Sequence, residues 1–333
     1  MTDVISAEIE EVLADGNIPW KELKNSTFLV TGAGGLIGGA LVRSLKAADD
    51  RFGLNINIIA HTRKTHGDIR NDINIDSFPD YIIHCASITK SSEMIKNPVE
   101  VMDVAANGTR RILNLARDTG SKSVVFLSSM EVYGQTEKNE VCENDLGYID
   151  LSDPRSSYPE GKRFCEALCM AYYKQFGVPV KIARLAQTFG GGVDPNETRV
   201  FAQFARNAIK GADIELHTEG KSVGNYCHIS DTVRALFTLL LKGDNGQTYN
   251  IANPSASMTI RQMAELVAEK ICGGRIKVVV KIPEDIKERG YSRDVGFVLN
   301  IEKIKKLGWY PKYGLSEMYE SLIADWVQKG AGI

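Results

Sequence analysis

The sequence predicts an α/β protein in which a doubly wound parallel sheet is followed by a smaller C-terminal α/β domain. Short apolar, β-branched runs alternate with longer segments of helical periodicity as far as residue 184, which is typical of parallel strands joined by helices. The first of these runs is followed at once by a glycine-rich turn and a helix. The 333 residues are more than one such sheet needs, so a second domain is expected.

The elements of the main sheet can be placed in order along the chain. Residues 1–25 are expected to form an acidic helix and a connector. The strands are expected at 27–30, 56–60, 81–86, 123–127 and 178–184. The helices between them are expected at 40–45, 98–117 and 158–176, the last with Pro159 in its first turn.

Beyond about residue 185 the alternation loosens into a glycine-rich loop, a helix over 199–210 and short elements. We therefore predict a main-sheet domain over 1–184 and a smaller domain over 185–333. Within the smaller domain, the segment 226–253 is expected to return to the main sheet, chiefly through the apolar run 229–241.

The composition argues against several kinds of partner and compartment. The formal net charge is −2, which gives no reason to expect nucleic acid or an anionic membrane as a partner. No apolar stretch approaches the ~18 residues of a membrane helix, and the N-terminus lacks a signal-like pattern. The six cysteines have no disulfide-like or zinc-like spacing, and Cys165 and Cys169 are interpreted as buried thiols. We expect a cytoplasmic protein without a metal site.

The glycine-rich turn after the first strand is a candidate dinucleotide site. Gly32, Gly35 and Gly38 let the backbone turn tightly and approach a pyrophosphate at the positive end of the following helix. Leu36 and Ile37, where that helix begins, belong to the same predicted cofactor-binding set. A glycine motif alone is weak support, but this one has the strand and helix of a Rossmann unit around it. The alternative is an ordinary strand-to-helix turn.

Three polar side chains in separate segments predict proton transfer beside such a cofactor. Ser129 follows the strand at 123–127, and Tyr158 and Lys162 lie one helical turn apart on one face of a helix. Tyrosine is a poor base at neutral pH because its pKa lies at about 10, and a nearby lysine charge favours the phenolate. With Ser129 sharing the substrate oxygen, the three groups could remove a proton from a carbinol while hydride leaves for a nicotinamide.

Motifs spread along most of the chain carry a family resemblance. They lie at 31–38, 67–70, 84–87, 107–109, 128–134, 158–162, 183–185 and 307–311. Together they resemble the extended short-chain dehydrogenase/reductase family, specifically its nucleotide-sugar epimerases, dehydratases and decarboxylases. The resemblance implies a nucleoside-diphosphate sugar as substrate, bound by the smaller domain. It also implies a homodimer joined through the helices at 98–117 and 158–176.

The same resemblance implies roles for individual residues. Asp68 and Ile69 would contact the adenine, and Ala86 and Ser87 would line the cofactor cleft. Tyr158 and Lys162 would be the catalytic pair, with Lys162 also holding the nicotinamide ribose.

The end of the second strand does not decide between NAD and NADP as the dinucleotide. A carboxylate at the end of that strand would hold the ribose 2′-hydroxyl of NAD, but here it runs into His61, Thr62, Arg63 and Lys64. Arg63 could accommodate the 2′-phosphate of NADP, or it could stack on adenine. The resemblance to redox-neutral enzymes favours NAD, with NADP as the alternative.

Glu131 bears on which sugar reaction follows. In the resembled family, 4-epimerases usually have a small residue there, whereas dehydratases and UDP-glucuronate decarboxylases usually have glutamate. Such a carboxylate can act at carbon 5 or 6 once carbon 4 is a ketone. The segment around Tyr158 most resembles the decarboxylases, yet the arginine expected of them falls on Gly224. Epimerisation, dehydration and decarboxylation all stay open, and a solvated Glu131 at the cleft rim is the structural alternative.

Three further residues are candidates for substrate binding. Gln187 stands where the family usually has an asparagine in the loop after the last strand. Arg199 and Arg293 could clamp a diphosphate, since a guanidinium offers a fork suited to phosphate oxygens, although surface salt bridges are the alternative. Two rival functions are an NADP-dependent keto-sugar reductase and a non-catalytic protein that senses the cofactor.

Overall fold

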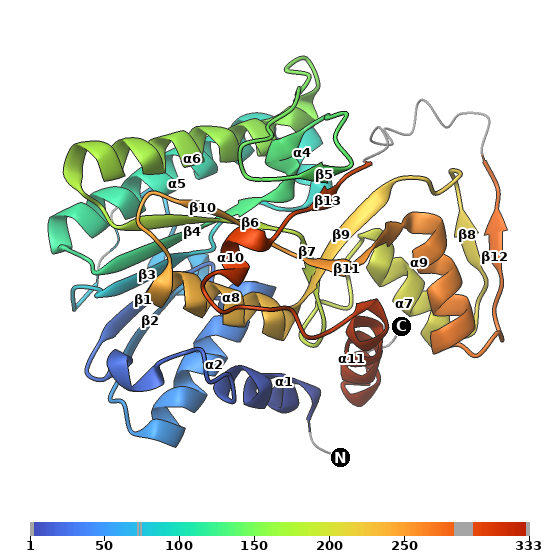
Figure 1. The fold of residues 1–333 in the computed structure, drawn as a ribbon, viewed down its shortest axis with the longest axis horizontal. Coiled ribbons are helices and arrows are strands. Elements are labelled where there is room, and N and C mark those ends of the chain that lie inside the picture. Colours follow the sequence, from blue (N-terminus) through green and yellow to red (C-terminus); the bar gives the residue numbers. More distant parts are fainter. Residues whose placement is uncertain (1–2, 72, 74, 283–295, 331–333) are drawn as a thin grey trace.

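The computed structural model describes residues 3–71, 73, 75–282 and 296–330 (Figure 1). Its largest element is a parallel sheet with the strand order β10-β6-β4-β3-β1-β2. The strands are β1 (Thr27–Thr31), β2 (Asn57–His61), β3 (Tyr81–His84), β4 (Ser123–Ser129), β6 (Val180–Leu185) and β10 (Thr248–Ile251). The chain runs outward from β1 to β2 and then in the opposite direction from β3, which confirms the doubly wound sheet.

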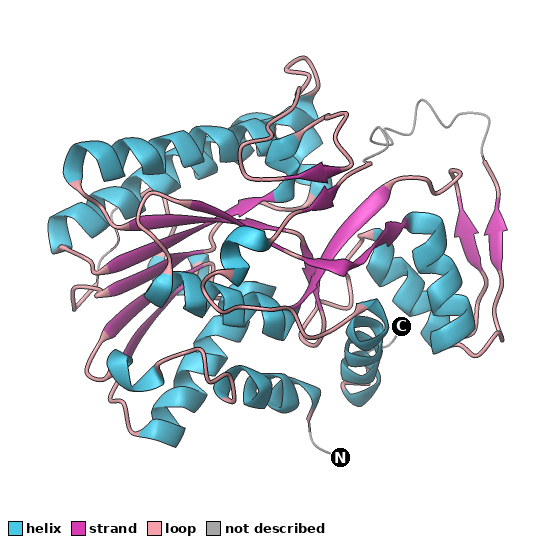
Figure 2. Ribbon diagram, viewed as in Figure 1, coloured by secondary structure: helices cyan, strands magenta, loops and turns pink. Residues whose placement is uncertain are grey.

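Helices cover both faces of this sheet (Figure 2). On one face lie α5 (Pro98–Thr119) and α6 (Ser157–Phe176), whose apolar sides share a core with β3, β4 and β6. On the other face lie α1 (Val4–Leu13), α2 (Leu36–Phe52) and α8 (Ile229–Lys242), which share a second core with the sheet. Because both faces are covered, β4 and β6 are buried along nearly their whole length.

The segment 226–253 supplies two elements to the larger part. Helix α8 packs on the sheet, and β10 pairs with β6 at the sheet edge. A later segment, which the sequence pattern did not predict to do so, also joins this core through Phe297, Leu299 and the fully buried Trp309.

The smaller part has its own sheets and apolar core. Its strands are β7 (Gln187–Phe189), β8 (Ile214–Leu216), β9 (Val223–His228), β11 (Asn253–Thr259) and β12 (Val278–Val280), paired in the orders β11-β9-β7 and β12-β8. Its helices are α7 (Val200–Lys210), α9 (Ile260–Leu266), the π-helical turn η4 (Val267–Ile271) and α11 (Leu315–Gln328). Their core includes a stacked pair, Phe189 on Phe201, with Tyr319 and the buried Trp326.

Short elements complete the described chain. Two more strands pair with each other, β5 (Glu140–Val141) and β13 (Val298–Leu299). The remaining helices are α3 (Arg63–His66), α4 (Ser91–Lys96) and α10 (Glu302–Lys305), and the 3-10 turns are η1 (Trp20–Leu23), η2 (Met130–Tyr133) and η3 (Pro154–Ser156).

The glycine-rich loop that follows β7 is held by carboxylates from both ends of the described chain. Glu8 of α1 accepts a hydrogen bond from the backbone N–H of Gly191 at 2.7 Å, and Asp325 of α11 accepts one from Gly192 at 3.0 Å. Glu8 also lies 3.3 Å from His228 Nε2. The predicted N-terminal helix therefore anchors this loop as well as packing against α2 and α8.

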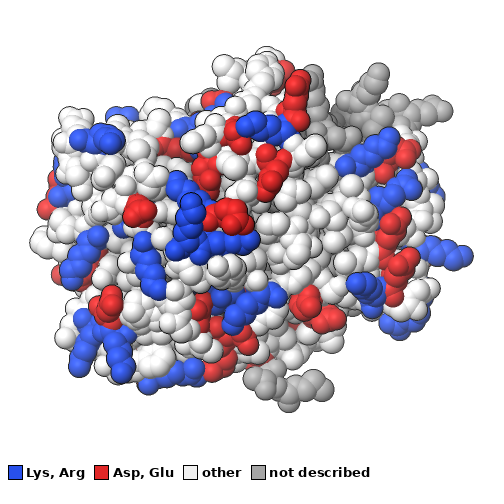
Figure 3. All heavy atoms as spheres, in the orientation of Figure 1, with Lys and Arg blue, Asp and Glu red and all other residues white. Residues whose placement is uncertain are grey.

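The surface carries charged side chains of both signs. On the face drawn in Figure 3, basic and acidic side chains are interspersed. Within the described residues, no helix combines the length and apolar character needed to span a bilayer.

Candidate active site

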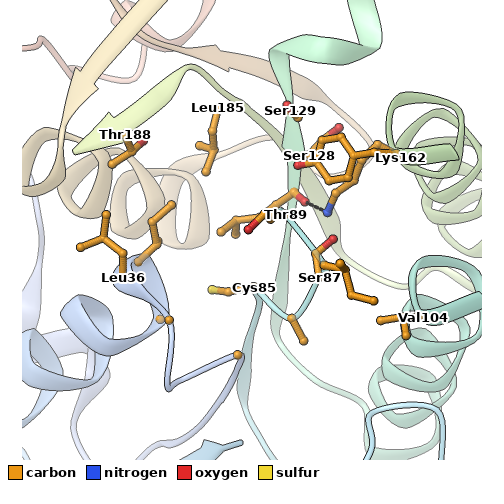
Figure 4. A pocket seen from close by; sticks show the side chains of 18 of the residues that line it. Leu36, Cys85, Ser87, Thr89, Val104, Ser128, Ser129, Lys162, Leu185 and Thr188 are labelled. Atoms are coloured by element: carbon orange, nitrogen blue, oxygen red, sulfur yellow. Dashed lines mark hydrogen bonds between the residues drawn. The ribbon is translucent and has the colours of Figure 1, made fainter. Parts of the chain in front are cut away.

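A cavity of about 570 Å³ opens at the carboxyl ends of the parallel strands. The segments that leave β1, β2, β3, β4 and β6 all line it, at 32–38, 61–63, 85–89, 127–131 and 185–188. Its centre therefore lies where the strand order reverses, which is where ligands bind in open sheets of this kind. Figure 4 shows Leu36 and Thr188 on one side of the cavity and Ser128, Ser129 and Lys162 on the other.

The glycine turn needs glycine at two positions. Gly32 has a φ of +67°, and a Cβ there would lie 2.8 Å from the backbone nitrogen of Ala86. A Cβ at Gly38 would lie 2.3 Å from the carbonyl oxygen of Gly32. Gly35 is the N-cap of α2, so the turn presents a bare backbone and a helix N-terminus to the cavity, which fits a dinucleotide pyrophosphate.

The other residues expected to hold the cofactor line the same cavity. Leu36, Ile37, Ala86 and Ser87 face it, as do Arg63, Asp68 and Ile69 farther along. Asp68 accepts two side-chain hydrogen bonds from Arg70, which hold the pKa of that carboxyl down at about 2. Asp68 is thus an anchored acceptor. Arg63 begins the short helix α3, where Thr62 is the cap.

The structure brings Ser129, Glu131, Tyr158 and Lys162 to one wall of this cavity. Ser129 ends β4, and its hydroxyl accepts a hydrogen bond from the backbone N–H of Glu131 at 3.2 Å, which starts the turn η2. Tyr158 and Lys162 lie in the first turns of α6, as their spacing predicts. A hydroxyl, a carboxylate, a phenol and an ammonium therefore surround the same space.

Burial dominates the electrostatics of Tyr158. It raises the pKa of the phenol well above its usual value, and the Glu131 charge adds to that rise. A hydrogen bond with Ser129 and the positive charges of Arg199 and Arg155 act in the opposite direction without cancelling it. The net result is a raised pKa, because burial outweighs these nearby positive charges.

Lys162 is buried against the sheet. Its ammonium donates a hydrogen bond to the carbonyl oxygen of Leu127 at 2.7 Å and lies 5.8 Å from the centre of the Tyr158 ring. Burial lowers the pKa of Lys162 itself. The side chain is thus fixed between β4 and the cavity, within reach of both the phenol and a bound cofactor.

The candidates for substrate binding differ in what surrounds them. Gln187 lines the cavity, and its carbonyl oxygen is buried with no hydrogen-bond partner among the described residues, so it is free to receive a ligand donor. Arg199 also lines the cavity, and it pairs with Glu197 at 2.6 Å. Arg293 lies outside the described residues. Gly224, by contrast, is on β9, where a Cβ would lie 2.2 Å from the Tyr226 hydroxyl, so a larger side chain does not fit.

Sequence reasoning missed Arg155. Its guanidinium donates a hydrogen bond to Glu131 at 2.8 Å, and both residues line the cavity. The available signal was a cation three residues before Tyr158, but the pairing joins positions 24 apart in loops whose geometry the sequence does not reveal.

A buried ion pair stabilises the elements that carry the residues of this wall. Arg184 of β6 makes two hydrogen bonds to Glu166 of α6, at 2.9 and 2.6 Å, and the Ser128 hydroxyl donates to the same carboxylate at 2.5 Å. This network joins β4, β6 and α6 next to Ser129.

His84 is a buried structural residue. Its ring lies 2.7 Å from the Thr31 hydroxyl and 3.3 Å from the Thr109 hydroxyl, so it links β1 and β3 to α5. The Thr31 hydroxyl in turn accepts from the backbone N–H of Ala86 at the cavity floor. This arrangement is expected of a hydrogen-bonded core histidine.

The neutral state of His84 predicts a pH dependence of stability. Burial, and secondly the Lys162 charge, lowers the pKa of His84 from 6.5 to about 3. Between these values the unfolded chain binds a proton that the folded chain does not. The stabilisation is therefore complete above pH ~6.5 and is lost toward pH ~3, at about 1.4 kcal/mol per pH unit. Denaturant unfolding of the protein and of His84→Gln in this range should show a shallower slope for the variant, and equal slopes would contradict the assignment.

No group of three or more His, Cys, Asp or Glu side chains in the described part of the chain could hold a metal ion. Cys165 and Cys169 are buried in the core shared by α5 and α6.

Comparisons with known proteins agree with this geometry. The family model described as the NAD dependent epimerase/dehydratase family matches residues 28–252. The chain is 32% identical over 309 residues to UDP-glucuronic acid decarboxylase 6 of Arabidopsis thaliana, which covers 88% of this chain and 86% of that protein.

Solved structures with a similar fold include UDP-glucose 4-epimerase of Thermotoga maritima with UDP-glucose. Its TM-score is 0.75, with 22% identity over 91% of this chain and 99% of that one. Another is the dTDP-glucose 4,6-dehydratase DesIV of Streptomyces venezuelae with NAD bound, with a TM-score of 0.71, 20% identity, and coverage of 91% and 97%. A third is RMD of Pseudomonas aeruginosa with NADPH, with a TM-score of 0.73, 21% identity, and coverage of 91% and 100%.

Proposed function

The chain belongs to the NAD-dependent epimerase/dehydratase family, and we propose that it oxidises carbon 4 of a nucleoside-diphosphate sugar and later returns the hydride to the sugar. The single observation that carries this proposal is that Ser129, Glu131, Tyr158 and Lys162 line the same cavity as the glycine turn. Membership of this family makes the chain an NAD-dependent nucleotide-sugar enzyme, so the non-catalytic alternative is set aside.

In the proposed first step, Tyr158 takes the proton of the carbon 4 hydroxyl, and Ser129 shares that oxygen. Bound NAD would supply the hydride acceptor. Tyr158 can take this proton only as a phenolate, and burial raises its pKa. The Lys162 ammonium on the same wall, together with the positive nicotinamide ring of bound NAD, would favour the ionised form. Gln187 and Arg199 would hold the sugar and its diphosphate, through the unpaired amide oxygen and the guanidinium.

The second step would take place at carbon 5 or 6 with the help of Glu131. The relatives that are UDP-glucuronic acid decarboxylases favour loss of carbon dioxide from a nucleotide hexuronate. The glycine at 224, where the resembled decarboxylases have an arginine, favours a substrate whose carbon 6 needs no such cation, for example a hexose that is dehydrated.

A panel of UDP-, GDP-, dTDP- and CDP-sugars, each incubated with the protein and followed by mass spectrometry, tests the proposal. A loss of about 44 mass units would identify decarboxylation, a loss of about 18 dehydration, and an unchanged mass with altered retention epimerisation. The proposal is wrong if no sugar nucleotide is altered and none reduces the bound cofactor.

A second candidate is an NADPH-dependent reductase of a keto-sugar, because Arg63 lines the adenine side of the cavity where NAD-binding folds usually place a carboxylate. Consumption of one NADPH for each product would select it. Turnover without added reductant would exclude it.

We expect a homodimer built on α5 and α6, which pack side by side on one face of the sheet (Figure 1) and carry exposed apolar side chains. Val99 is 81% exposed, and Met102 and Phe164 are each 45% exposed. Phe164→Glu should therefore yield a monomer in sedimentation equilibrium, whereas Phe78→Glu, at an exposed phenylalanine elsewhere, should leave the dimer intact. A parent protein that sediments as a monomer would contradict this expectation.

A cytoplasmic location also stays our expectation. All six cysteines are free, as is usual in a reducing compartment.

A further inference from the structure

The residue that sequence reasoning missed, Arg155, forms the only ion pair found on the catalytic wall among the described residues. Arg155 Nη1 lies 2.8 Å from Glu131 Oε2, and both side chains are partly buried, at 28% and 32% exposed. Both border the cavity beside Tyr158. The Glu131 charge raises the pKa of that phenol, whereas the Arg155 charge lowers it. The pair thus lies within the site and is not a tether on the outer surface.

The two partners are anchored by their own backbones. Asp153 accepts a hydrogen bond from the Arg155 backbone N–H at 2.9 Å and caps the turn η3, which leads directly into α6. On the other side, the Ser129 hydroxyl fixes the backbone N–H of Glu131. Arg155 is therefore held by the same helix start that carries Tyr158, and Glu131 by the strand end that carries Ser129.

The two oxygens of the Glu131 carboxylate differ in their hydrogen bonding. Oε2 is engaged by Arg155, whereas Oε1 has no hydrogen-bond partner among the described residues. One oxygen fixes the orientation of the group while the other stays available to a substrate. A carboxylate that transfers a proton to or from carbon needs such an orientation, because the transfer depends steeply on the position of the reacting atoms.

We infer that Arg155 is a positioning residue, which holds Glu131 for proton transfer at carbon 5 of the 4-keto sugar. This inference rests on the proposed function. In dehydration, the carbon 5 proton passes to Glu131 and then to the leaving carbon 6 hydroxyl, which departs as water and leaves a carbon–carbon double bond. In decarboxylation, the bond between carbon 5 and the carboxylate breaks, carbon dioxide leaves, and its electron pair stays on the sugar as the carbon 5 enolate. Glu131 in its protonated form then gives its proton to carbon 5. Arg155 itself exchanges no proton, and its effect on this second step is exerted through Glu131.

The test separates the two chemical steps in Arg155→Met and Arg155→Lys, each made alone and together with Glu131→Gln. Single-turnover absorbance of the reduced cofactor reports oxidation of carbon 4, and mass spectrometry reports the product. Arg155→Met should form reduced cofactor within about twofold of the parent rate but release product at least about tenfold more slowly, and Arg155→Lys should restore part of the loss. In the Glu131→Gln background, adding Arg155→Met should change the product rate by less than about twofold.

Two results would overturn the inference. One is an equal loss of product rate with and without Glu131→Gln, and the other is a raised KM with kcat unchanged, which would mean that Arg155 binds substrate directly. Arg199→Met is the matched control, since it removes a cavity arginine that pairs with Glu197, and it should raise KM without causing reduced cofactor to accumulate.

A crystal structure of Arg155→Met gives a readout that does not depend on turnover. The Glu131 carboxylate should leave its position in this variant and keep it in Arg155→Lys. An unmoved Glu131 would overturn the inference even if the reaction proves different. Conversely, a parent protein in which no sugar nucleotide is altered and none reduces the cofactor would refute the proposed function, and the crystal comparison would still decide what Arg155 does.

Discussion

Tyr158→Phe is expected to lower kcat by about a thousandfold or more while NAD binding persists. In the proposed mechanism the phenol removes the carbon 4 proton, and general base catalysis contributes about 10²–10⁴-fold. The ring that packs against Met94 and Val101 is kept, so the fold should be unaffected. The measurements are product formation by mass spectrometry, NAD affinity by calorimetry and the midpoint of thermal unfolding.

Tyr172→Phe is the matched control for this prediction. Tyr172 lies on the same helix α6, but its hydroxyl donates to Asn114 and it does not line the cavity. Its replacement should leave kcat within about twofold of the parent value. Full activity of Tyr158→Phe would remove the tyrosine from the mechanism. Loss of NAD binding in that variant would show that the phenol supports the cofactor site instead.

Arg184→Leu is expected to destabilise the fold by about 3–5 kcal/mol. The substitution leaves the Glu166 carboxylate, which is almost completely buried, without its cation, and an uncompensated buried charge is costly. Denaturant unfolding measures the loss. Activity should fall as well, because the network holds Ser128 beside Ser129, to which we assign a catalytic role.

Two comparisons make the Arg184 prediction specific. Replacing both partners, as in Arg184→Leu with Glu166→Leu, should recover part of the lost stability because no charge is then left unpaired. Arg51→Ala breaks an exposed ion pair with Glu10 and should cost less than about 1 kcal/mol. A loss for Arg184→Leu no greater than that for Arg51→Ala would contradict the role assigned to the buried pair.

The parts of the site that were predictable are those encoded within a few residues of one another. The turn from Gly32 to Gly38 could be found because its strand and helix adjoin it, and its steric need for glycine follows from local geometry. Tyr158 and Lys162 could be paired because one helical turn separates them. The parallel sheet followed from the alternation of apolar runs, although the third strand ends at His84 rather than at Ala86, because the chain leaves the sheet there to line the cavity.

The parts that were not predictable depend on contacts between distant segments. The pair of Arg155 with Glu131 joins two loops whose paths are set by packing, not by periodicity. The electrostatics of Tyr158 likewise depends on how deeply it is buried, and the sequence spacing of Lys162 could not reveal that burial. The return of residues 297–309 to the main core has no local signal either.

The two hydrogen bonds that hold the loop after β7 affect when this loop can be fixed during synthesis of the chain. Glu8 reaches Gly191 across 183 positions, and Asp325 reaches Gly192 across 133. Contacts so far apart in sequence form late and slowly. On the ribosome, the glycine-rich turn after β1 emerges early, whereas Asp325 can hold the loop at Gly192 only after α11 has been synthesised. A nascent chain arrested before that helix would keep the Glu8 contact to Gly191 but lack the Asp325 contact to Gly192.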